Sequence, residues 1–88
     1  VMIEYPRAGV YTVGFAMGRA CAHLEEKKNA QLVNVFVPTT PTPTAGFFLL
    51  VPINEVTPLN MTMEEALKLI TSSGLITPDD SKYRINGN

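Results

Sequence analysis

The chain has 88 residues and a formal net charge of −1, and 45% of its residues are hydrophobic and 17% charged. This length predicts one domain, and the apolar content excludes a disordered chain because it can supply a core. No cluster of basic residues is larger than Lys27–Lys28, so the chain lacks the positive surface that nucleic acids or anionic lipids require, and we expect no nucleic-acid partner.

The N-terminal residues predict a β-hairpin. Val1–Tyr5 is β-prone and alternating, a proline–glycine turn follows, and Val10–Met17 again alternates with a period of two. Gly14, inside the second strand, indicates a bulge or a close approach of another backbone segment. We expect Glu4 to pair with Arg7 at the turn.

Three further strands are predicted after a charged insert. Gly18–Ala30 is rich in Ala, Leu, Glu and Lys and predicts either a short helix or a mobile excursion between strands. Gln31–Val37 returns to β-branched alternation. Gly46–Val51 is apolar on both faces and is predicted to be the most central strand. Ile53–Leu59, bordered and interrupted by prolines, predicts a short strand at an edge.

A helix is predicted near the C-terminus. Thr62 and Glu65 have the spacing of a capping box, in which each side chain accepts a hydrogen bond from the other residue's backbone N–H. Gly74 suits the left-handed position just after a helix. One apolar stripe, with the spacing i, i+3, i+4 and i+7, consists of Met63, Ala66, Leu67 and Ile70.

These elements predict an α+β domain over residues 1–76. We expect a small, mostly antiparallel sheet or a partly open barrel of about five strands, with one C-terminal helix packed on it. Residues 77–88 are hydrophilic and predict a disordered tail.

The segment between the two most apolar strands has an unusual composition. It reads VFVPTTPTPTAGFFLLVP, and its central part, Pro38–Gly46, is named here the Pro/Thr loop. Three prolines fix φ and predict a stiff, extended connection. The loop is either a rigid link that sets strand register or a recognition surface; a polyproline ligand is disfavoured because both ends are tethered. The candidate binding residues are Thr39, Thr40, Thr42, Thr44, Gly46, Phe47 and Phe48.

The remaining titratable and metal-ligating side chains do not predict a metal site or a catalytic site. Cys21 and His23 supply two of the four ligands of a structural zinc site, and residues two apart diverge on a helix. The adjacent carboxylates Glu25–Glu26 and Glu64–Glu65 also diverge, so we expect solvated faces rather than acid–base catalysis. We therefore expect no enzyme, no metal and no cofactor.

Three segments resemble the DUF502 family, membrane proteins of bacteria and plants that are related to the plant LIKE-COV proteins. They are IEYPRAGVYTVGF, VFVPTTPTPTAGFFLLVP and VTPLNMTMEEALKLITSSG, and the resemblance covers about residues 3–76. Thr42 and Ala45 depart from the Asn and Ser of the family pattern, and Gly18–Ala30 is atypical. The resemblance implies two transmembrane helices upstream of Val1, with this chain as the soluble domain behind them on the cytoplasmic side. It implies no reaction.

Two classes of function follow. The first is an interaction or assembly domain of a membrane protein, which pairs with itself or with a protein partner through the loop or an exposed sheet edge. The alternative is a small-ligand sensor in which the Pro/Thr loop forms the rim of a pocket. We expect a homo-oligomer or a protein partner, and a membrane location.

Overall fold

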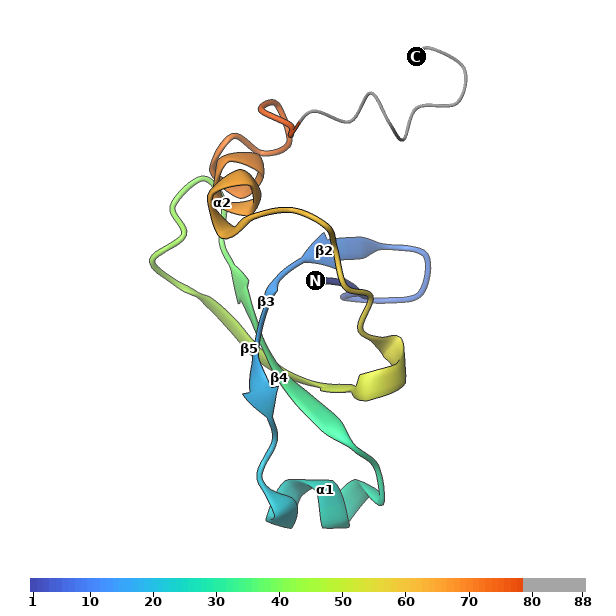
Figure 1. Ribbon diagram of the computed structural model, residues 1–88. Coiled ribbons are helices and arrows are strands. Elements are labelled where there is room, and N and C mark those ends of the chain that lie inside the picture. The colour runs from blue at the N-terminus through green and yellow to red at the C-terminus, as the bar shows by residue number, and fades with distance from the viewer. Residues whose placement is uncertain (79–88) are drawn as a thin grey trace.

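The computed structural model describes residues 1–78 and has the α+β fold predicted from the sequence (Figure 1). Residues 79–88, most of the predicted tail, lie outside the described part. The five strands are antiparallel and divide into a two-stranded sheet and a three-stranded sheet of order β3-β4-β5, not a barrel. The elements are β1 (Met2–Glu4), β2 (Tyr11–Val13), β3 (Phe15–Arg19), α1 (Ala22–Lys28), β4 (Leu32–Pro38), β5 (Gly46–Pro52), the 3-10 helix η1 (Ile53–Glu55) and α2 (Met63–Thr71).

Gly14 divides the second predicted strand between the two sheets. β2 ends just before it and pairs with β1, whereas β3 begins just after it and pairs with β4. A Cβ atom on Gly14 would lie 2.9 Å from both the carbonyl oxygen of Phe36 and Cγ1 of Val35. The predicted close approach is therefore confirmed, and it lets the chain cross from one sheet to the other.

The central strand of the larger sheet is β4, so the prediction that Gly46–Val51 is the most central strand is wrong. β5 pairs with β4 alone and is an edge strand. Apolar residues on both faces of a strand favour burial, but a strand is central only if another strand pairs with each of its two edges. Within residues 1–78, no strand pairs with the second edge of β5. Phe47, Phe48 and Leu50 accordingly stay exposed.

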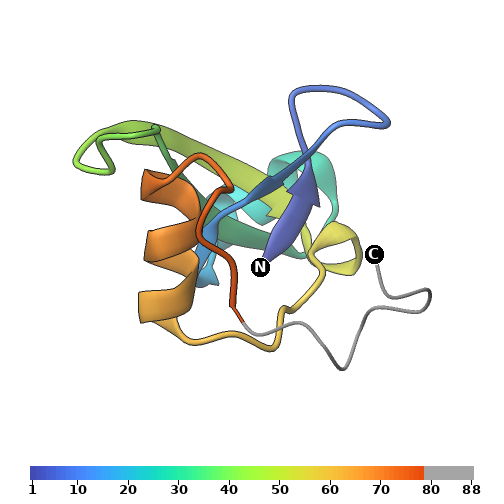
Figure 2. The same cartoon turned by 90° about the horizontal axis from the view of Figure 1, so that it is seen from above.

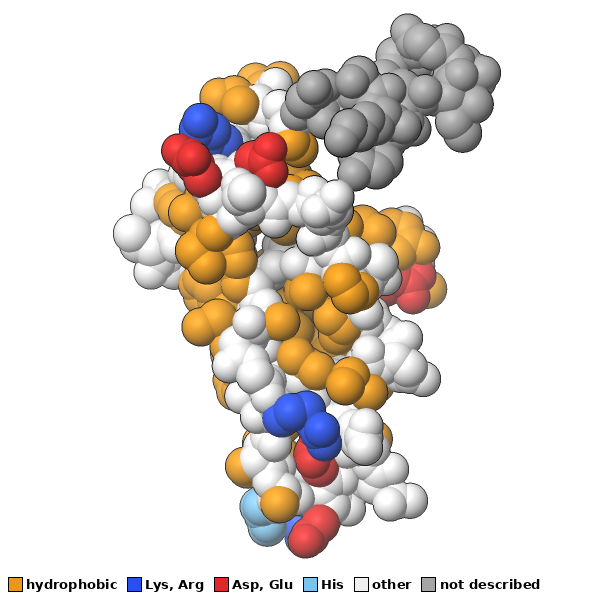
Figure 3. All heavy atoms as spheres, in the orientation of Figure 1, with side chains coloured by type: hydrophobic (Ala, Val, Ile, Leu, Met, Phe, Trp, Pro, Cys, Tyr) orange, Lys and Arg blue, Asp and Glu red, His pale blue; other side chains and the backbone are white. Residues whose placement is uncertain are grey.

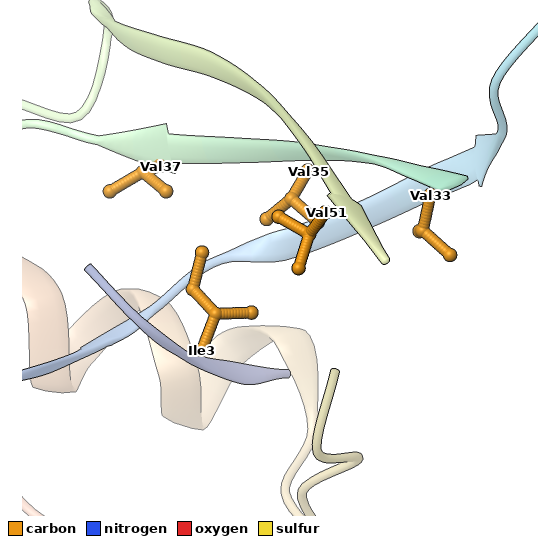
Figure 4. Close-up of a cluster of buried hydrophobic side chains, with 5 residues drawn as sticks. All are labelled: Ile3, Val33, Val35, Val37 and Val51. Carbon is orange, nitrogen blue, oxygen red and sulfur yellow. The ribbon is translucent and has the colours of Figure 1, made fainter. Parts of the chain in front are cut away.

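A small core lies between the two sheets. Ile3 of β1 faces the valines on one face of the three-stranded sheet (Figure 4). Every second residue of β4 contributes to that face because strand side chains alternate. The core cluster consists of Ile3, Val33, Val35, Val37 and Val51, and Val35 is fully buried.

The predicted strand Ile53–Leu59 does not form. Its first residues make η1, and Ile53 is 45% exposed. Only Thr57 pairs with another strand: its backbone N–H donates to the carbonyl of Met2 at 2.9 Å and its carbonyl accepts from Met2 N–H at 2.8 Å. The prolines on either side of this short segment prevent a longer ladder.

Helix α2 begins as the sequence predicts. The Thr62 hydroxyl accepts from Glu65 N–H at 3.1 Å, and the Glu65 carboxylate accepts from Thr62 N–H at 2.8 Å, which confirms the capping box. Ala66 and Ile70 are buried, whereas Met63 is 67% exposed, so the buried stripe is narrower than predicted. Figures 1 and 2 place α2 beside the end of the sheet where β4 and β5 are connected.

Within the described residues, neither α-helix combines the length and the apolar character needed to cross a bilayer.

Candidate functional site

The Pro/Thr loop closes the β4–β5 hairpin in a bent conformation. Thr39 N–H donates to the carbonyl of Ala45 at 2.8 Å, and the chain turns at residues 43–44. Pro38 and Gly46 are register partners, so the residues between them must reverse the chain direction. For this reason the predicted extended conformation is wrong, although the loop does connect the two strands in register.

The hydroxyl of Thr39 holds the loop together. It lies within hydrogen-bonding distance of two carbonyl oxygens, those of Thr42 and Ala45, and its single proton can serve one of them at a time. Thr40, Thr42 and Thr44 are exposed at the tip of the hairpin. Of the four threonines predicted to bind a partner, Thr39 thus has an internal role that the sequence did not reveal.

Gly46 also has a steric role. A Cβ atom there would collide with the carbonyl of Val37 and would lie 2.8 Å from Cα of Pro38. These are backbone atoms of the paired strand and cannot move aside without loss of the ladder. The close approach of the two strands therefore explains why a residue without a Cβ atom occupies position 46.

The loop lines none of the three hollows whose linings the structure defines. A hollow of about 340 Å³ borders α1, one of about 270 Å³ lies beside β1, and one of about 180 Å³ lies beside α2. The loop therefore offers exposed hydroxyls on a convex hairpin tip rather than the rim of one of these hollows.

Phe47 and Phe48 point to opposite faces of the sheet. Phe47 lies on the core side, where its ring centroid is 6.1 Å from that of Tyr5. Phe48 lies on the other side, named here the outer face, in register with Phe36, which in turn pairs with Phe15. One row of phenylalanines therefore crosses the three strands on the outer face.

The outer face continues to the free edge of β5. Phe48 and Leu50 lie there and are 66% and 38% exposed, and Phe47 on the core side is 54% exposed. Figure 3 shows hydrophobic side chains along the side of the molecule where Figure 1 draws β3 and β5. The hairpin thus carries an exposed apolar surface.

The backbone at this edge is open. Hydrogen bonds from Thr39 N–H to Ala45 and from Ile53 N–H to Gln31 flank the β4–β5 ladder and fix which residues of β5 face β4. By the alternation of an antiparallel ladder, residues 47, 49 and 51 bond to β4, whereas the N–H and C=O groups of Phe48 and Leu50 point away from it. No charged residue occurs from Asn29 to Asn54, so the hairpin itself carries none of the charged side chains that commonly protect an edge strand.

A second polar arrangement holds α1 on the larger sheet. Glu25 accepts hydrogen bonds from Leu32 N–H at 2.8 Å and from Arg19 Nε and Nη2, each at 3.0 Å. The Leu32 N–H and then Arg19 lower the pKa of Glu25. Glu25 is therefore not on a solvated face as predicted, although Glu26 is exposed. Nothing in the sequence pattern indicated this contact.

The hydrogen bonds of Glu25 anchor the charged insert, Gly18–Ala30, at both of its ends. Arg19 ends β3, Leu32 begins β4, and Glu25 lies in α1, so one carboxylate joins three elements. Of the two alternatives for Gly18–Ala30, the helix is confirmed, over Ala22–Lys28.

The other candidate groups remain apart. Cys21 and His23 are exposed at the start of α1, and among the described residues no group of three or more His, Cys, Asp or Glu side chains could hold a metal ion. Glu4 accepts a hydrogen bond from Gly9 N–H at 3.1 Å and forms no ion pair with Arg7. The prediction of a Glu4–Arg7 pair is therefore wrong. The turn brings the Gly9 N–H within hydrogen-bonding distance of the carboxylate.

The strands from β1 to β4 and most of the Pro/Thr loop match a known family, whereas β5 lies beyond the matched residues. No curated protein and no solved structure matches the chain. A family model described as "Protein of unknown function (DUF502)" matches residues 1–45, from β1 to the Pro/Thr loop. Since these residues make up more than half of the chain, the protein belongs to the DUF502 family.

Proposed function

We propose that this chain is a protein-interaction domain of a membrane protein and that it assembles through the β4–β5 hairpin. The observation that carries the proposal is the edge strand β5, in which Phe47, Phe48 and Leu50 are 54%, 66% and 38% exposed. Natural edge strands are usually protected by charged side chains, prolines or a covering element because an open ladder recruits other strands. An exposed apolar patch beside such an edge is typical of a binding surface.

The membrane part of the proposal is supported by the family. DUF502 proteins are membrane proteins, and we propose that two membrane-spanning helices precede this domain and that it lies on the cytoplasmic side. The single cysteine, Cys21, is exposed and unpaired, which is compatible with a reducing compartment.

The proposal is for binding rather than catalysis. His23 is the only histidine in the sequence, and it lies exposed in α1 and not in the β4–β5 hairpin. The hairpin itself offers hydroxyls, backbone groups and aromatic rings. These groups suit recognition, whereas general acid–base chemistry needs a titratable group in the site.

The interaction surface can be tested by site-specific photocrosslinking in the full-length protein in its own membrane. A benzophenone amino acid replaces Phe48 in one variant and, as a matched control, Tyr11 in the other; Tyr11 is an aromatic residue of β2 with a similar exposed fraction, 58% against 66%. We expect discrete protein adducts from position 48 and not from position 11. Equal adduct formation at the two positions, or none at position 48, would overturn the proposal.

The membrane side can be tested with Cys21. The exposed thiol is labelled by a membrane-impermeant maleimide in a full-length variant that has no other cysteine. We expect labelling in inside-out vesicles and protection in right-side-out vesicles. The reverse pattern would place the domain on the opposite side of the membrane.

A further inference from the structure

We infer that the partner of β5 is β5 of a second copy of this chain, paired antiparallel about a two-fold axis that passes beside Leu49. The inference rests on the proposed function and names its partner. It follows from the backbone groups, the length and the composition of this one edge.

The outward-facing backbone groups of β5 are self-complementary. Two antiparallel strands bond through residue pairs that exchange two hydrogen bonds each, and both members of a pair must face the partner. Phe48 and Leu50 both face outward. About an axis at Leu49, Phe48 of each copy stands opposite Leu50 of the other, so two such pairs form across the edge.

Strand length selects this register among those that the alternation allows. Axes beside Phe48 or Leu50 would also bring outward-facing residues together, but they would leave part of β5 opposite the Pro/Thr loop or η1. With the axis beside Leu49, all seven residues of β5 overlap and Gly46 stands opposite Pro52. Pro52 has no N–H, but its carbonyl can accept from Gly46.

The side chains on the outer face fit a second copy. Phe48 of one chain would pack beside Leu50 of the other, an aromatic–aliphatic cross-strand pair that occurs twice. Because no charged residue occurs from Asn29 to Asn54, the side chains of two such hairpins bring no like charges together. The result is one continuous sheet in which β3, β4 and β5 of the two copies form six antiparallel strands.

The exposed area predicts a weak contact for the free domain. Phe47, Phe48 and Leu50, which are 54%, 66% and 38% exposed, together offer on the order of 300 Å² per copy when a phenylalanine side chain can bury about 200 Å². Two copies would then bury on the order of 600 Å² of side chain, below the roughly 1,200 Å² of a standard stable interface. Copies held in one membrane gain an effective concentration of roughly millimolar, which offsets the small area.

Disulfide trapping tests the register. Phe48→Cys and Leu50→Cys are made separately in a Cys21→Ser background, and the two chains are oxidised alone and mixed. A hydrogen-bonded antiparallel pair has a Cα–Cα distance of about 5.5 Å, which fits a disulfide. Identical positions lie on opposite sides of the axis, offset by about 7 Å along the strands, and are too far apart. We expect covalent dimers mainly from the mixture.

Two results of the trapping would overturn the inference. One is a yield from the mixture no higher than that of a Tyr11→Cys control, which presents an exposed cysteine on β2. The other is preferential self-linking of Phe48→Cys or of Leu50→Cys, because it would show a different register. In either case, photocrosslinks to another protein from position 48 would leave the proposed interaction domain intact.

Hydrogen exchange of the unmodified chain gives a second measurement that does not depend on variants. The Phe48 and Leu50 amides should exchange rapidly in dilute protein and become protected at millimolar concentration, where the weak dimer forms. The Leu49 and Val51 amides, which bond to β4, should be protected at both concentrations. Protection of Phe48 and Leu50 that does not change with concentration would overturn the inference.

Discussion

Replacement of Val35 by Ala tests which strand lies at the centre of the fold. Val35 is 0% exposed and belongs to the core cluster between the two sheets. The substitution removes two buried carbons, at about 0.8 kcal/mol each, and a cavity term adds to the loss, so we expect about 2–3 kcal/mol of destabilisation. For a domain of this size that loss lowers the melting temperature by roughly 8–24 °C.

Phe48→Ala is the matched comparison because it removes a much larger side chain. Full burial of a phenylalanine side chain stabilises a protein by about 1.5–3 kcal/mol. Because Phe48 is 66% exposed, only about a third of that free energy, about 0.5–1 kcal/mol, is lost in the variant. Urea unfolding of dilute protein, followed by circular dichroism, measures both variants below the concentration of self-association. If Phe48→Ala destabilised the domain as much as Val35→Ala, β5 could not be an exposed edge, and the reasoning on the interaction surface would fail with it.

Two further substitutions test contacts that the structure alone revealed. Gly46→Ala should destabilise the hairpin by more than about 3 kcal/mol because its Cβ would collide with the carbonyl of Val37; a stability within 1 kcal/mol of the unmodified chain in urea unfolding would contradict this steric role. The pKa of Glu25 is lowered from 4.5 by its hydrogen bonds, so its stabilising contribution is present above about pH 4.5 and is lost as pH falls through the lower folded-state pKa. Between pH 7 and pH 3 the melting temperature should therefore fall less steeply for Glu25→Gln than for Glu26→Gln. An equal fall in the two variants would contradict the stabilising role of the Glu25 hydrogen bonds.

Local sequence patterns were sufficient wherever neighbouring residues decide the structure. Thr62 and Glu65 are three residues apart, and their reciprocal hydrogen bonds need nothing beyond that spacing, so the start of α2 could be predicted. The same holds for the N-terminal hairpin, whose two strands are joined by a short turn. Gly14 showed a close backbone approach, although the sequence did not identify Phe36 as the neighbour.

The candidate site could be predicted only in part. The composition of the Pro/Thr loop indicated a hairpin connection between two strands, which the structure has. The bend of the loop depends on the pairing of Pro38 with Gly46, and the internal role of the Thr39 hydroxyl depends on that bend. Neither is a property of a proline–threonine sequence by itself.

The sequence by itself determined that this protein is an α+β domain with mostly antiparallel strands, where its C-terminal helix begins, and its family. Only the tertiary structure decided that β4 is central and β5 lies at the edge, and that Glu25 joins α1 to Arg19 and Leu32. The physical reason is that an apolar run shows how readily a strand can be buried, whereas its neighbours determine whether it is buried. Those neighbours come from distant parts of the chain and, as we propose for β5, from a second copy of it.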